Sequence, residues 1–245
     1  MAYIGGKAKC YSHIIEILNN EMFDKMDYLE PFVGYCHILK RIRNKNRYLI
    51  SDVNPLLITL LKYIQKNTNY PIITKQEYEN LKKSTSNDTA TMISKSFAAF
   101  CYSYNGKEFG GYTLHDKSGK RDYPEERKRY YKFLYSNEPF SKSKIYLKNY
   151  YEYEPENMLI YCDPPYNNTT KYGNIKFDSE KFWEIMRKWS KKNYVYISEY
   201  NAPKDFIMIS NNNKWSSLAG KGSNTKRIEN LFTYKEGLGI KILKI

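Results

Sequence analysis

Hydrophobic runs and helix-like patterns alternate along most of this 245-residue chain. Residues 26–32 and 47–52 predict two strands, and the continuous apolar runs at 158–162 and 194–197 are typical of buried parallel strands. Apolar residues between strands recur with a helical period, most clearly over 182–189. This alternation predicts two β/α blocks built around a largely parallel sheet.

Some predicted helices carry their own start signals. Asn54 suits an N-cap and Pro55 the first helical position, directly after the second predicted strand. Either Asp178 or Ser179 would cap the helix over 182–189. The remaining regular patterns predict helices at 9–20 and 75–104 and strands at 205–215 and 226–235.

The regular pattern breaks down over residues 105–150, which are polar, aromatic and basic. We therefore divide the chain into a first part of the catalytic domain at 1–65, a helical and basic insertion at 66–150, and a second part of the catalytic domain at 151–245. Basic side chains in the insertion are candidates for binding phosphates, which Lys and Arg neutralise, while Tyr can stack on bases. These candidates are Lys117, Lys120, Arg121, Arg127, Lys128 and Arg129.

The overall charge favours a polyanionic partner. The chain has 40 Lys and Arg against 26 Asp and Glu, which leaves a formal net charge of +14. A charge of this size points to nucleic acid before acidic membrane. A solvated, charged helix face remains the alternative for the insertion, because Asp122, Glu125 and Glu126 lie among its cations.

Composition excludes several other classes. The apolar share of 41% supports a packed core, and the longest apolar stretch, 55–61, is too short to span a bilayer. The N-terminus lacks the apolar segment of a secretory signal, and the four cysteines are scattered without a CxxC pair, so we expect a non-secreted, intracellular protein in a reducing compartment, in cytoplasm, nucleoid or a viral replication site. His13, His37 and His115 lack metal-ligand spacing, so we expect no metal.

The strongest chemical signal is Asp163-Pro164-Pro165-Tyr166, directly after a predicted central strand. Ligands of open α/β sheets bind at such strand ends. The carboxylate and the Pro164 carbonyl can accept hydrogens from a planar exocyclic amine, and Tyr166 can stack on the ring that carries it. A strand-terminating turn with a surface tyrosine is the structural alternative.

Three weaker signals involve glycine turns and an acid. Glu30-Pro31-Phe32-Val33-Gly34 follows the first predicted strand, where glycine lets backbone approach a ligand, although a simple turn also explains it. Asp52 ends the second strand, where an acid often accepts hydrogen bonds from ribose hydroxyls or else caps a helix. The segment Tyr3-Ile4-Gly5-Gly6-Lys7 suits a carboxylate or phosphate, or is a plain N-terminal turn.

In this order, the motifs resemble the D12-class (Dam-like) DNA adenine-N6 methyltransferases. The shared segments are YIGGK (3–7), EPFVGYC (30–36), SDVN (51–54), FCYSYNGKEFGGY (100–112), DPPY (163–166), FDSEKFW (177–183), YISEYNAP (196–203) and IENLF (228–232). The resemblance covers nearly the whole chain. One departure is Cys36, which stands where the family has the second glycine of its cofactor loop.

The resemblance implies an α/β fold: a Rossmann-like class I methyltransferase sheet with one antiparallel strand and a small basic target-recognition insertion. It implies S-adenosyl-L-methionine as cofactor and duplex DNA as substrate. Asp163, Pro164, Pro165 and Tyr166 would hold a flipped adenine during catalysis. The implied cofactor-binding residues are Tyr3, Gly6, Lys7, Glu30, Pro31, Phe32, Gly34, Asp52, Asn54 and Asp163, with Asp52 on the ribose hydroxyls and Lys7 near the methionine carboxylate.

Two other functions stay open at this point. The same acid-Pro-Pro-Tyr chemistry would serve an amino methyltransferase acting on RNA adenine or on a protein glutamine amide, although the basic charge speaks against a protein substrate. A nucleic-acid-binding protein that kept the fold and lost the cofactor is the other alternative, supported by Cys36.

Overall fold

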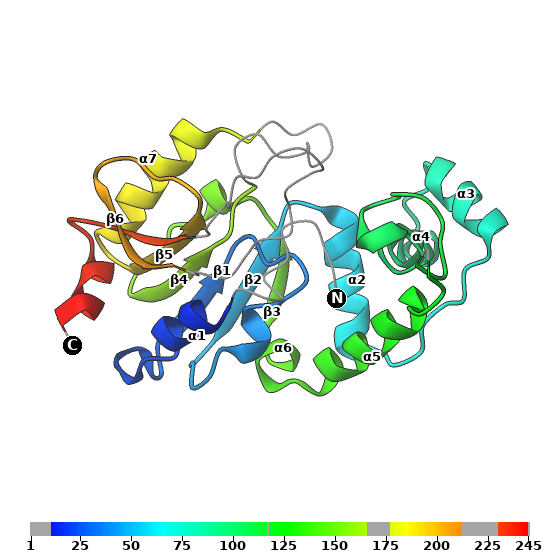
Figure 1. Ribbon diagram of the computed structural model, residues 1–245, viewed down its shortest axis with the longest axis horizontal. Coiled ribbons are helices and arrows are strands. Elements are labelled where there is room, and N and C mark those ends of the chain that lie inside the picture. Colours follow the sequence, from blue (N-terminus) through cyan, green and yellow to red (C-terminus); the bar gives the residue numbers. More distant parts are fainter. Residues whose placement is uncertain (1–10, 117, 166–176, 212–229, 245) are drawn as a thin grey trace.

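The computed structural model describes residues 11–116, 118–165, 177–211 and 230–244. A sheet with helices on both faces forms one part of the molecule, and a group of helices extends from it at the far side of α2 (Figure 1). Tyr3, Gly6, Lys7, Lys117 and Tyr166, which the sequence analysis singled out, lie outside the described residues.

The described residues form a seven-stranded sheet in the order β3-β2-β1-β4-β5-β7-β6. β7 runs antiparallel to both of its neighbours, β5 and β6, while the pairs from β3 to β5 are parallel. The predicted Rossmann-like sheet with one antiparallel strand is therefore confirmed. The strands are β1 (Asp27–Glu30), β2 (Tyr48–Asp52), β3 (Lys144–Leu147), β4 (Met158–Cys162), β5 (Tyr194–Glu199), β6 (Phe206–Asn211) and β7 (Asn230–Tyr234).

The central strand β4 is buried along its whole length because helices cover both faces of the sheet. Its residues alternate between two hydrophobic cores: Leu159 and Tyr161 enter the larger core, and Ile160 and Cys162 the smaller one. Side chains from α1 (Ser12–Leu18) and α2 (Pro55–Lys66) complete the larger core, and those of α7 (Ser179–Ser190) complete the smaller one. The sheet therefore presents the ends of its strands, rather than its faces, to a ligand.

The predicted helix starts at α2 and α7 are confirmed. The Asn54 side-chain oxygen accepts hydrogen bonds from the backbone N–H groups of Leu56 and Leu57, and Pro55 occupies the first helical position. Asp178, one of the two predicted caps, accepts a hydrogen bond from the N–H of Lys181 at α7. Both caps satisfy backbone donors that a helix start leaves open.

The single helix predicted over 75–104 is two helices, α3 (Lys75–Lys83) and α4 (Thr89–Cys101). Each has its own N-cap, Thr74 in a capping box and Asp88 at the second start. Two further helices, α5 (Tyr123–Ser136) and α6 (Glu138–Ser141), lie where the sequence showed no clear pattern. Short 3-10 turns occupy Glu21–Phe23, Leu39–Arg41, Tyr104–Gly106, Tyr150–Glu152 and Leu238–Lys244.

Helix α2 joins the two parts of the molecule. It contacts β2 and β3 on the sheet, and it contacts α4 and α5 on the other side. The strand β3, which falls within the range 66–150, pairs with β2 as a regular member of the sheet. Helices α3, α4 and α5 thus stand beside the strand ends as an insertion between two neighbouring strands. Among the described residues, no helix is long and apolar enough to cross a membrane.

Candidate active site

Three carboxylates gather at one edge of the sheet. Glu30 is the last residue of β1, Asp52 is the last residue of β2, and Asp163 follows the last residue of β4. Because β1 lies between β2 and β4 and all three run parallel, their carboxyl ends meet at this edge. This is where open α/β sheets bind ligands.

Asp163 and the prolines after it sit at the centre of this edge. Asp163 is partly exposed, Pro164 is buried and Pro165 is partly exposed. The Asp163 carboxylate is close enough to Glu30 for its charge to raise the pKa of that residue. The turn therefore holds an acid at the rim of the sheet, with rigid backbone behind it.

Glu30 is a buried acid at the floor of the site, with 2% of its surface exposed. Burial is the main cause that raises its pKa to about 8, and the charge of Asp163 adds to this. Hydrogen bonds from the Tyr28 hydroxyl, at 2.8 Å, and from the Leu39 backbone N–H act in the opposite direction. The Glu30 side chain therefore carries its proton for much of the time near neutral pH.

Asp52 ties the loop after β1 to the end of β2. Its Oδ2 accepts a hydrogen bond from the N–H of Gly34 at 3.3 Å, and its Oδ1 accepts one from the N–H of Asn54 at 3.0 Å. Burial raises the pKa of Asp52, while these backbone donors counteract the increase. The side chain is still partly exposed, so a carboxylate fixed in direction faces the strand ends.

The loop after β1 contains two residues with left-handed backbone. Gly34 has φ of +48° and Cys36 has φ of +56°. Glycine adopts this conformation at little cost, whereas a residue with a Cβ pays about 1 kcal/mol or more. The Cys36 side chain is fully buried in the larger core, and burial raises the pKa of its thiol. The backbone geometry explains why a glycine suits position 36.

Aromatic rings form one side of the site. Phe32 lies 5.2 Å from Tyr150, 6.3 Å from Phe177 and 5.9 Å from Phe182, measured between ring centroids. Pro31, beside it, is buried. Sequence analysis did not assign Tyr150 or Phe177 to the site. The position of Tyr150 shortly after β3, at the same edge of the sheet, is the signal that could have identified it.

Asn54 has two structural contacts. Besides capping α2, its side-chain amide donates a 2.6 Å hydrogen bond to the carboxylate of Glu108. Glu108 belongs to the insertion, so this bond connects the end of β2 to the turn after α4. Sequence analysis predicted both the cap and a cofactor contact for Asn54. The structure confirms the cap, and the cofactor contact stays a prediction.

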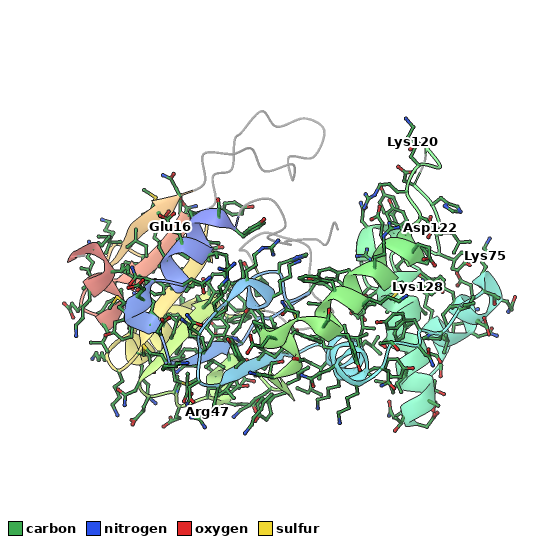
Figure 2. All side chains as sticks on the ribbon, turned by 90° about the horizontal axis from the view of Figure 1, so that it is seen from below. Glu16, Arg47, Lys75, Lys120, Asp122 and Lys128 are labelled. Atoms are coloured by element: carbon green, nitrogen blue, oxygen red, sulfur yellow. The ribbon has the colours of Figure 1, made fainter. Side chains whose placement is uncertain are left out.

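The basic residues of the insertion differ in their exposure and in whether they form ion pairs. Lys120 and Arg129 are exposed. Arg121 forms two hydrogen bonds with Glu126, at 2.8 and 2.6 Å, and Lys128 pairs with Glu125 at 2.7 Å. Figure 2 shows Lys120 at the outer tip of the insertion and Lys128 closer to its body.

Arg127 corrects one of the sequence assignments. It is 2% exposed, so it does not lie on the surface with the other cations. Its position in α5 explains this, because Tyr123, Arg127, Tyr131 and Leu134 share the buried face of that helix. Among the described residues, no group of three or more His, Cys, Asp or Glu is arranged to hold a metal ion.

Comparisons with known proteins agree with the motif order. Residues 3–95 match the model of the D12 class N6 adenine-specific DNA methyltransferases, which confirms the resemblance found in the sequence. A "DNA adenine methylase" of Haemophilus influenzae is 25% identical over 213 residues, which cover 72% of this chain and 68% of that protein.

Two solved structures of the rRNA methyltransferase AviRa from Streptomyces viridochromogenes are similar to this chain over 96% of its length and 84% of theirs. Their TM-scores are 0.41 and 0.40, and their identities with this chain are 9% and 8%.

Proposed function

We propose that this chain, which resembles the D12 class of N6 adenine-specific DNA methyltransferases over residues 3–95, methylates adenine in duplex DNA after flipping the base out of the helix. S-adenosylmethionine supplies an electrophilic methyl group when it is bound. The observation that carries the proposal is the position of Asp163 and Pro164 at the end of β4, beside Glu30 and between the ends of neighbouring strands.

Asp163 and Pro164 would act on the target amine. The adenine N6 lone pair delocalises into the ring, so this nitrogen is a poor nucleophile. An ionised Asp163 and the Pro164 carbonyl would accept hydrogen bonds from the two N–H groups of this amine. These hydrogen bonds would favour a pyramidal nitrogen with a localised lone pair. Fixed acceptors of this kind act through placement and electrostatics, and no covalent intermediate is required.

The residues at the ends of β1 and β2 suit a nucleoside-bearing cofactor. Asp52 presents an oriented carboxylate to which ribose hydroxyls would donate, and the left-handed turn at Gly34 brings backbone close to the strand ends. Phe32 and Pro31 provide apolar surface beside them. Lys7, Tyr3 and Gly6 would complete the site from the N-terminus, and Asn54 would support it by fixing the start of α2.

The flipped base would meet Tyr166, the last residue of DPPY. A base inside a stacked duplex cannot reach the end of β4, so the target nucleotide must leave the stack. Stacking of the base on an aromatic ring is worth about 1–3 kcal/mol, which would offset part of the cost of unstacking. Pro165 would keep the turn rigid between Asp163 and Tyr166.

The insertion would hold the duplex. Lys120 and Arg129 offer exposed charge at its surface, and Lys117 and the ion-paired Arg121 and Lys128 lie in the same segment. Contacts of Lys and Arg with phosphates would make binding strongly dependent on salt. An enzyme that acts on DNA in this way would work inside a cell.

The proposal is tested with Asp163→Ala and with labelled S-adenosylmethionine on duplex DNA. Loss of a fixed acceptor typically costs about a hundredfold or more in rate, so we expect methyl transfer to fall at least that far while duplex binding persists. Nucleoside analysis of the wild-type product should show N6-methyladenine. Turnover of Asp163→Ala at the wild-type rate would refute the catalytic assignment.

The same assay separates the alternatives. A matched RNA substrate that is methylated in preference to DNA would redirect the proposal to RNA adenine. Calorimetric titration with S-adenosylmethionine, alone and with duplex present, tests for a protein that has lost its cofactor. Absence of binding under both conditions in a folded protein would contradict a methyltransferase function.

A further inference from the structure

A buried arginine lines a small cavity inside the insertion, away from the three carboxylates of the proposed active site. Arg127 lies in α5 with 2% of its surface exposed. The cavity is also lined by Tyr70, Phe97, Tyr102, Lys128 and Tyr131. The volume of the cavity is about 10 Å³, which is space for one water molecule or one ion of similar size.

Most polar groups of the cavity wall already have partners. The Tyr102 hydroxyl donates to the carbonyl of Pro71 at 3.1 Å, and the Tyr131 hydroxyl accepts from the thiol of Cys101 at 3.4 Å. Lys128 is paired with Glu125. Each of these groups therefore already has a partner among the described residues.

Three donor atoms on two residues of the wall remain without an acceptor. The Nε and Nη1 of Arg127 and the hydroxyl of Tyr70 are buried, and within the described part of the chain they have no hydrogen-bond partner. Burial raises the pKa of Tyr70 to about 12, so this hydroxyl keeps its proton. A guanidinium does not lose its proton in proteins, and a buried charge without a partner is costly.

The surroundings of Arg127 balance its charge only in part. The described residues of the cavity wall include no carboxylate, and the neighbouring Glu126, whose charge attracts Arg127, is itself engaged by Arg121 at 2.6 Å. A Cβ at Gly106 would lie 2.5 Å from Nη2 of Arg127, so the guanidinium occupies space that only a glycine leaves open. The ring of Tyr35 lies 5.6 Å from the guanidinium carbon and provides a weak cation–π contact.

We infer that this cavity binds one small monovalent anion of about the size of a halide, held by Arg127 and Tyr70. The limited space excludes sulfate, phosphate and the phosphodiester of DNA. A water molecule would satisfy donors but would leave the positive charge unbalanced. The inference rests on the cavity alone, so it does not depend on the proposed methyltransferase function.

The test compares wild type with Arg127→Met in chloride, bromide and gluconate salts of sodium at equal ionic strength. Wild type should show a saturable rise of melting temperature with halide, about 3–6 °C at tenfold excess over Kd, because the ligand binds only the folded state. Arg127→Met should lose this rise. Because it removes an unpaired buried charge, it should match or exceed wild-type stability in gluconate.

Arg129→Met is the matched control, since Arg129 lies in the same helix and is exposed. It should keep the halide-dependent rise. Tyr70→Phe, which removes one donor and little volume, should weaken halide affinity several-fold, and it keeps the test decisive if Arg127→Met does not fold. In a crystal grown with bromide, an anomalous peak should lie within hydrogen-bond distance of Arg127.

Equal melting of wild type in halide and gluconate would overturn the inference. So would a halide effect that survives in Arg127→Met, or a bromide-grown crystal with only water in the cavity. None of these outcomes involves methyl transfer, so failure of the anion site and failure of the proposed function remain distinguishable.

Discussion

Glu30 and Arg127 have the same exposed fraction, 2%, but the sheet and the insertion accommodate their charges differently. Glu30 receives hydrogen bonds from Tyr28 and from the Leu39 backbone, and its pKa of about 8 lets it take up a proton. Arg127 has neither option, because its guanidinium stays charged and its Nε and Nη1 lack partners in the described structure. A buried carboxylate can lose its charge by binding a proton, whereas a buried guanidinium stays charged and requires a counter-ion.

The same contrast extends to the polar groups around them. At the sheet edge, Asp52 is held by backbone donors from two segments and remains oriented toward the strand ends. In the insertion, Arg121, which precedes α5, and Lys128, which lies in α5, are both held by acids of that helix. Asp52 thus stays partly exposed at the sheet edge, whereas Arg121 and Lys128 have their charge paired within the insertion.

The largest effect should come from Glu30→Gln, which removes the titrating group at the sheet edge and keeps its shape. The folded pKa of Glu30 lies above its ordinary value of 4.5, so the stability that Glu30 contributes is fully present below about pH 4.5 and is lost as pH rises through about 8. The difference in stability amounts to about 5 kcal/mol, because each pKa unit corresponds to about 1.4 kcal/mol.

Denaturant unfolding at a series of pH values from 5 to 9 measures this effect in the ligand-free protein. The wild type should lose stability relative to Glu30→Gln as pH rises across this range. Parallel curves for the two proteins would show that Glu30 does not titrate in the folded state, and the contrast with Arg127 would disappear.

Asp52→Asn tests the oriented carboxylate. Hydrogen bonds to charged groups contribute about 1.5–3 kcal/mol, so the dissociation constant for S-adenosylmethionine should rise about 10- to 100-fold in calorimetric titration. Asp88→Asn is the matched control, because it makes the same change from acid to amide at the N-cap of α4, where asparagine also caps a helix, and it should leave the affinity nearly unchanged. Unchanged affinity in Asp52→Asn would remove Asp52 from the cofactor site.

Cys36 offers a test of backbone strain in the same loop. A protein with alanine at a regular backbone position is normally more stable than one with glycine there. At position 36, where φ is +56°, we expect glycine to give the more stable protein. We expect Cys36→Gly to be more stable than Cys36→Ala by about 1 kcal/mol, since both lose the buried thiol and only glycine relieves the strain. Thermal unfolding of the two variants decides this, and a more stable alanine variant would contradict it.

The smallest effect concerns single phosphate contacts in the insertion. Lys120→Ala and Arg129→Ala should each lower the salt dependence of DNA binding by about 0.9 in the slope of log K against log salt. Arg121→Ala should change the slope less, because Glu126 already holds its guanidinium. Titrations of duplex DNA at several salt concentrations measure all three, and equal slopes would show that ion pairing inside the insertion does not matter.

The strands of the sheet and the N-caps of helices α2 and α7 could be predicted because their sequence signals are local and strong. The apolar run at Met158–Cys162 marks a strand buried on both faces, and Asn54-Pro55 marks a helix start within two residues. The order of motifs then placed Asp52 and Asp163 at strand ends, where the structure has them.

The insertion could not be predicted in the same way because its buried face is not aliphatic. Helix α5 buries Tyr123, Arg127 and Tyr131, residue types that a hydrophobic pattern counts as polar or ambiguous. Charge counting also assigned Arg127 to the surface, since only packing shows that Gly106 and α4 enclose it. Likewise, Tyr150 and Phe177 contact Phe32 from segments distant in the sequence, and the site assignment did not include them although Phe177 begins the shared segment FDSEKFW.

The pairing of β2 with β3 has a consequence for how the chain folds. Leu49 pairs with Lys144, so 95 positions separate partners that lie side by side in the sheet, and closing a loop of that length costs about 4 kcal/mol of chain entropy. Packing of α2, α4 and α5 against one another shortens the flexible loop between β2 and β3, so that β3 can pair with β2. A chain whose insertion fails to pack therefore leaves β2 as an open edge strand, ready to pair with another molecule and aggregate.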